Sequence, residues 1–181
     1  MISPVGLLAR RLRHWLRAED GTMSSDFVIV FPAFMMVFLG SFEAGMLMSR
    51  SVMLERAVDM SVRDLRVGLY ENPTHDQIKA DICARMVIMP GCMESLLLEL
   101  RPVSTSTWNV FDGPATCVNR DEPVQPVTTW TGGESNEMML VRACAVFDPY
   151  FPTSAWGLQL PLDASGGYQL VAMSAFVNEP R

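Results

Sequence analysis

The side chains best suited to chemistry in this sequence are four cysteines, which all lie in its C-terminal two-thirds: Cys83, Cys92, Cys117 and Cys144. Their even number and the absence of a CxxC pair indicate two disulfides rather than a metal site. Four cysteines allow three pairings. We favour Cys83–Cys92 and Cys117–Cys144, because the first two are close in sequence and flank a turn at "MPGC".

Residues for catalysis are scarce. His75 stands beside Asp76, but an acid in the first turn of a helix is the ordinary complement of the helix dipole. No GxSxG, HExxH or paired-carboxylate signature is present. The fourteen methionines fall mostly in apolar runs, where methionine is a flexible filler. We therefore expect no enzyme activity, no metal and no cofactor.

A carboxylate, Asp26, stands directly before the most apolar segment of the chain. Residues 27–48, "FVIVFPAFMMVFLGSFEAGMLM", carry only two polar side chains, Ser41 and Glu43. As a helix this segment would be roughly 33 Å long, enough to cross the ~30 Å hydrocarbon core of a bilayer. The sequence therefore predicts one membrane-spanning helix with an acid at its entrance.

The flanking charges predict the orientation of this helix. Four arginines precede it, and acids alternate with bases after it. By the positive-inside rule the N-terminus is cytoplasmic and the chain beyond about Ser49 lies outside. Without residues 1–21 the chain has ten basic and eighteen acidic residues, a net charge of −8. Such a charge disfavours nucleic-acid binding.

The remaining pattern predicts an α+β fold. Apolar residues continue at helical spacing after the span, which extends the helix over about 25–69, and Thr74 with Gln77 forms a capping box for a second helix at 75–88. Four later segments favour strands, at 94–100, 105–111, 139–147 and 168–177. We expect the long helix to pack its apolar stripe on a small antiparallel sheet of three or four strands.

The segment "AEDGTMSSDF" at 18–27 resembles the processing site of type IV pilin precursors. In that superfamily a prepilin peptidase cuts after a glycine, and an acidic residue at the head of the apolar helix follows the cut. The resemblance implies cleavage between Gly21 and Thr22, with Asp26 in place of the usual glutamate. Asp26-Phe27 is similar to the Glu-Tyr or Glu-Phe of the tight-adherence (Flp-type) branch.

Further likeness is to the TadE-like minor pilins of that branch. Pro32 and the later "FEAGML" are similar to their "VEFALVLP…EYG" pattern, and the closing "SAFVNEP" resembles their C-terminal strand. The likeness covers the first 70 residues well and the last ten loosely. It departs in the shorter aspartate and in Ser25, where an aliphatic residue is commoner.

The resemblance implies a minor pilin (pseudopilin) in the bacterial inner membrane, single-pass, with a periplasmic C-terminal domain and a place in the pilus. Implied partners are a prepilin peptidase, the major pilin, other minor pilins, the inner-membrane pilus platform and membrane lipid, with no nucleic acid. The implied parts are a basic leader at 1–21, a transmembrane helix at 22–49, its periplasmic continuation at 50–70 and a globular domain at 71–181.

Asp26, Phe27 and Glu43 are the expected assembly residues. Cleavage would create an α-amino group on Thr22, which could pair with the Asp26 carboxylate of a neighbouring subunit and fix the axial register. Glu43 has two interpretations: a contact between subunits, helped by the nearby Gly40 and Gly45, or a side chain that reaches the outer membrane interface.

Two other functions stay open at this point. A pseudopilin of a type II secretion system would carry glutamate at position 26 and lack Pro32. A single-span protein with a periplasmic binding or sensing domain would keep its leader.

Overall fold

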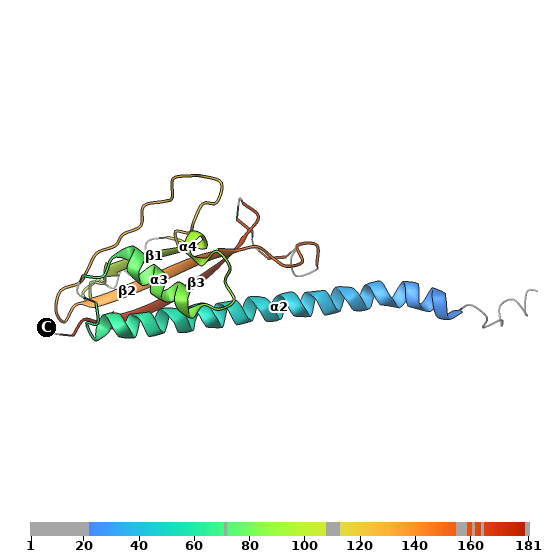
Figure 1. The fold of residues 1–181 in the computed structure, drawn as a ribbon, viewed down its shortest axis with the longest axis horizontal. Helices are drawn as coiled ribbons and strands as arrows, with labels where there is room; N and C mark the ends of the chain where they lie inside the picture. The colour runs from blue at the N-terminus through green and yellow to red at the C-terminus, as the bar shows by residue number, and fades with distance from the viewer. Residues whose placement is uncertain are drawn as a thin grey trace, which may run out of the picture. The chain divides into compact units, whose positions relative to one another are not determined.

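The computed structural model describes residues 22–70, 72–107, 113–154, 159–160, 162–163 and 165–179. Within them the fold is α+β, with the element order α2 (Thr22–Arg66), α3 (His75–Arg85), α4 (Cys92–Ser95), β1 (Leu96–Pro102), β2 (Met138–Phe147) and β3 (Tyr168–Val177). Figure 1 shows the long helix α2 and the strands of the sheet. The predicted fold class is therefore confirmed.

Helix α2 belongs to two compact units, which divide between Leu39 and Gly40. In the first unit the side chains of residues 24–39 are almost all exposed, and the helix continues through Pro32. In the second unit one stripe of α2 is buried: Leu54, Ala57, Val58, Ser61, Val62 and Leu65. The change from an apolar surface on all sides to a single stripe follows the sequence pattern.

The sheet has three antiparallel strands in the order β1-β2-β3, so β2 is central. Leu98 of β1 is opposite Ala143 of β2, which is in turn opposite Ala172 of β3. Because side chains alternate between faces, all three of these residues point to one side. That side also carries Ala145, so small residues line the part of the sheet under the helices.

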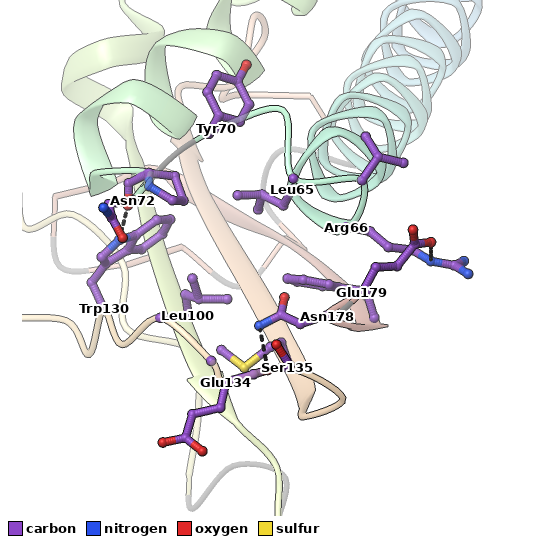
Figure 2. A pocket seen from close by; sticks show the side chains of 17 residues that line it. Leu65, Arg66, Tyr70, Asn72, Leu100, Trp130, Glu134, Ser135, Asn178 and Glu179 are labelled. Atoms are coloured by element: carbon purple, nitrogen blue, oxygen red, sulfur yellow. Dashed lines mark hydrogen bonds and ion pairs between the residues drawn. The ribbon is translucent and has the colours of Figure 1, made fainter. Parts of the chain in front are cut away.

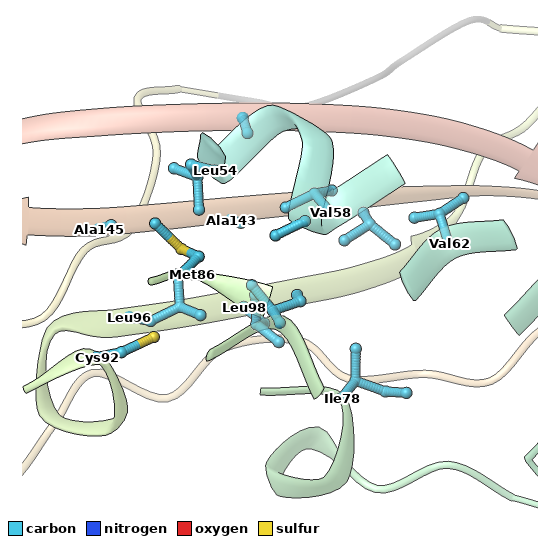
Figure 3. Packing of buried hydrophobic residues seen from close by; sticks show 14 of the residues in the cluster. Leu54, Val58, Val62, Ile78, Met86, Cys92, Leu96, Leu98, Ala143 and Ala145 are labelled. Carbon is cyan, nitrogen blue, oxygen red and sulfur yellow. The ribbon is translucent and has the colours of Figure 1, made fainter. Parts of the chain in front are cut away.

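The core forms where α2 and α3 cover this face of the sheet. Figure 3 shows Leu54, Val58 and Val62 of α2 together with Leu96 and Leu98 of β1, above the alanines of β2. Ile78 and Ile82 of α3 are fully buried in the same cluster. The alanines allow the helix backbone to approach the sheet closely, while the leucines of β1 and α2 fill the space beside them.

Polar contacts define the start of α3 and hold this helix against α2. The Thr74 hydroxyl accepts the Gln77 N–H and the Gln77 side chain accepts the Thr74 N–H, which is the predicted capping box. Ser61 donates to Asp81 over 2.7 Å. Arg85 bridges Asp81 and Asp64 at 2.9 and 2.6 Å. The hydrogen bond that Arg85 donates to Asp81 is the chief cause that raises the pKa of Arg85, so the cation persists at any working pH.

Two disulfides join elements of the domain. Cys83 of α3 is bonded to Cys92 of α4, and Cys117 is bonded to Cys144 of β2, the pairing favoured from the sequence. The second bond holds the segment around Cys117 against the sheet face opposite the helices. There Leu97, Val118 and Val146 form a separate buried cluster.

Several boundaries differ from the sequence prediction. Helix α2 ends at Arg66 instead of 69, and Leu69 is 66% exposed rather than part of the stripe. Residues 105–107 of the strand expected at 105–111 form a turn, and 108–111 lie outside the described residues. Residues 92–95 form the helical turn α4, so β1 begins at Leu96. The helix and strand propensities of residues 92–95 do not predict this turn. It begins after Gly91, whose backbone has a left-handed conformation that glycine adopts readily.

The disulfides should stabilise the domain unequally. They close loops of 9 and 27 residues. The loop-closure treatment gives a loss of about 2.5 kcal/mol for Cys83→Ala/Cys92→Ala and about 3.5 kcal/mol for Cys117→Ala/Cys144→Ala. Urea unfolding in dodecyl maltoside, followed by fluorescence, measures both losses. The reverse order would show that chain entropy does not govern these bonds.

Candidate functional site: an apolar helix and its polar anchor

The N-terminal part of α2 presents an unusually apolar surface. Its large side chains are 43–72% exposed: Phe27, Val28, Ile29, Val30, Phe31, Phe34, Met36, Val37 and Phe38. The Phe27 and Phe31 rings stack at 4.8 Å, and Phe34 lies 6.3 Å from Phe38. A contiguous apolar surface of this kind marks a membrane or protein interaction site. Within the described residues α2 is the one helix long and apolar enough to cross a membrane.

The predicted processing and register residues lie at the start of this helix. Thr22 is the first residue of α2, and Gly21 lies outside the described residues. Asp26 is in the second turn and exposed, with Phe27, 61% exposed, beside it. The Asp26 carboxylate is thus open to a second molecule.

Glu43 has a defined place within the globular unit. It is 0% exposed, and its carboxylate accepts two backbone hydrogen bonds from the loop after β2. The N–H of Tyr150 donates to Oε1 over 3.1 Å, and the N–H of Phe151 donates to Oε2 over 2.9 Å. Hydrogen bonds that an ionised carboxylate accepts are stronger than those between neutral groups. Glu43 therefore holds this loop on the helix.

Arg50 lies two helical turns after Glu43 and is also buried. Its Nη1 donates to the Tyr168 hydroxyl over 2.9 Å and to the Asp148 carbonyl over 3.4 Å. Its guanidinium carbon lies 4.9 Å from the Phe147 ring centroid and 4.6 Å from that of Tyr150. The cation therefore joins α2, the start of β3 and the loop after β2.

Tyr168 stays protonated beside this arginine. Burial raises the pKa of its phenol, and Arg50 acts in the opposite direction without cancelling the effect. A neutral hydroxyl can accept the hydrogen bond from Arg50, but it carries no charge that would balance the guanidinium.

Sequence reasoning identified Glu43 but not its partners, and it missed Arg50, Tyr150 and Tyr168. The sequence feature that could have indicated Arg50 is its spacing from Glu43. Glu43 and Arg50 are seven residues apart, which places them on one face of a helix in an otherwise apolar stretch. The loop that they hold is more than a hundred residues later in the chain.

A separate hollow of about 760 Å³ lies at the other end of the domain. Figure 2 shows Leu65 and Arg66 from the end of α2 facing Trp130, Asn178 and Glu179. Trp130 donates to the Pro73 carbonyl over 2.9 Å, and Arg66 pairs with Glu179 at 3.3 Å. These polar side chains thus have partners within the hollow, and the described residues contain no His, Cys, Asp and Glu cluster that could hold a metal ion.

Residues 21–63 match the model of the TadE-like protein family, which is consistent with a TadE-like pilus component. This segment holds Gly21, Asp26, Pro32 and Glu43. It therefore covers the apolar surface and also Glu43 and Arg50, which hold the loop after β2. The family is a structural one and suggests a component associated with the tight-adherence pilus. No curated protein and no solved structure matches the chain.

Glu43 should be a major source of stability for the domain. Glu43→Ala leaves two partly buried N–H groups without their acceptor, which should cost about 3 kcal/mol, and Glu43→Gln should cost about half because one oxygen remains. Urea unfolding in dodecyl maltoside gives the free energies. Hydrogen exchange of peptides that cover Tyr150 and Phe151 should accelerate in the same order.

Glu55→Ala is the matched control, since Glu55 is an exposed acid on the same helix. Exchange at 150–151 that is equal in Glu43→Ala and in the control would contradict the anchoring role.

Proposed function

We propose that this chain is a minor pilin of a tight-adherence type IV pilus, cleaved after Gly21 and assembled through the N-terminal part of α2. The observation that carries the proposal is the exposed apolar surface between Phe27 and Phe38, directly after an exposed Asp26. The match to the TadE-like family over residues 21–63 supports it. The work of such a subunit is assembly rather than turnover.

The apolar surface needs two successive environments in this account. Before assembly, lipid surrounds the helix, with residues 1–21 in the cytoplasm and the domain in the periplasm of a bacterial cell. During assembly the same side chains pack against the helices of neighbouring subunits. Gly45 favours that contact, because it is exposed and an added Cβ there would meet no atom within 4 Å.

Asp26 gives this packing a register. Cleavage leaves a charged α-amino group on Thr22, and the exposed Asp26 of an adjacent subunit can pair with it. Both charges would lie in an apolar surrounding, where an unpaired charge costs several kcal/mol. The pair therefore discriminates between axial positions of two helices more than it adds affinity, as a buried polar residue does in a coiled coil.

The partners follow from these steps. A prepilin peptidase of the inner membrane removes the leader. The major pilin, other minor pilins and the membrane platform then contact the helix. The domain carries two disulfides, which suits an oxidising compartment.

The test is an Asp26→Ala variant in cells that make the pilus. Cleavage should remain intact, because the amino group still forms, while incorporation into sheared pili should fall at least about tenfold, since a lost desolvated pair costs more than 1.4 kcal/mol. Immunoblots of membrane and pilus fractions measure this. Asp26→Glu should restore most of the incorporation.

Asp59→Ala provides the control, because Asp59 is an exposed acid on the same helix within the globular unit. Normal incorporation of Asp26→Ala would refute the register role. Equal losses in Asp26→Ala and Asp59→Ala would do the same, since acidity alone would then matter.

A further inference from the structure

Three aromatic rings gather where the loop after β2 contacts α2. The Phe42 ring lies 6.2 Å from that of Tyr150 and 5.9 Å from that of Phe151, both edge to face. Phe42 is 47% exposed and Tyr150 is 45% exposed, so the group is open to its surroundings. We call Phe42, Tyr150 and Phe151 the aromatic patch.

The first part of this loop, residues 149–152, has no backbone N–H group without an acceptor. In residues 149–152, Pro149 and Pro152 have no N–H, and both remaining N–H groups donate to Glu43. The Phe151 carbonyl also accepts the Ser154 N–H over 2.9 Å. An unsatisfied backbone group in hydrocarbon costs several kcal/mol. These contacts remove that penalty for both N–H groups and for the Phe151 carbonyl, so this part of the loop is suited to a surrounding that offers little water.

The distance from Asp26 to the aromatic patch along the helix is close to the thickness of the hydrocarbon core of a bilayer. Phe42 comes sixteen residues after Asp26, which is about 24 Å along a helix, against a hydrocarbon core of about 30 Å. If Asp26 lies at the inner boundary, Phe42 lies within about 6 Å of the outer boundary, and the loop held by Glu43 contacts Phe42 there. Tyrosine and other aromatic rings concentrate at that level of a bilayer.

We propose that the aromatic patch is a membrane-interface anchor, which binds the boundary between headgroups and acyl chains of the outer leaflet. This inference rests on the proposed membrane-anchored function. The anchor sets the depth of the helix, so that the span ends shortly after Phe42 rather than at residue 49. Glu43 and Arg50 then belong to the domain and hold the loop in place.

Lipid photo-crosslinking of the full chain tests the anchor. The chain is reconstituted into vesicles of phosphatidylethanolamine and phosphatidylglycerol with p-benzoylphenylalanine in place of Tyr150, which keeps a phenyl ring in position. Phe34, 61% exposed, is the lipid reference site, and Val127, 98% exposed, is the water reference site. Mass spectrometry counts phospholipid adducts after irradiation.

We expect adducts at Phe34 and at Tyr150, with at least a tenfold excess over Val127. Adducts at Phe34 with a Tyr150 yield equal to that of Val127 would overturn the anchor and leave the membrane span intact. Failure at Phe34 as well would overturn both. A Tyr150 adduct to a second copy of the chain, without lipid, would assign the aromatic patch to a protein contact and also overturn the proposal.

Discussion

The 45-residue helix α2 has to present two kinds of surface along one helix, which continues through Pro32. Between Phe27 and Phe38 its large apolar side chains are exposed, and from Leu54 onward one stripe is buried against the sheet. The region between them carries Glu43 and Arg50, the charged residues that hold the loop after β2. Small residues in the strands and α3 over the sheet complete the core around the second surface, while the Cys117–Cys144 disulfide stabilises the opposite face of the sheet.

The contacts of Glu43 and Arg50 explain why the domain tolerates these two ionisable groups beside an apolar helix. A buried carboxylate is costly unless hydrogen bonds replace its hydration, and Glu43 receives two from backbone N–H groups. Arg50 is compensated by Tyr168, a carbonyl and two ring faces. Both side chains thus have structural partners within the chain, whereas Asp26, directly before the apolar segment, is exposed and under the proposed function would pair with another subunit.

Patterns within a few turns of chain predicted much of this fold. The stripe from Leu54 to Leu65, the capping box at Thr74, the strands near 139–147 and 168–177, and the cysteine pairing all follow from local spacing. The partners of Glu43 do not, because a backbone N–H on a distant loop leaves no mark in the residue types. The expected strand at 105–111 rested on β-propensity alone, which reflects packing more than an intrinsic backbone preference. For the candidate site, the sequence indicated Gly21, Asp26 and the apolar run, but not the aromatic patch.

The central claim is that the helix becomes an assembly element when the leader is removed. The most direct measurement is the intact mass of the chain extracted from membranes of cells that contain a prepilin peptidase, with peptidase-deficient cells as the reference. The account predicts a mature chain that begins at Thr22 in the first cells and a longer chain in the second. A chain that retains residues 1–21 in both would contradict it.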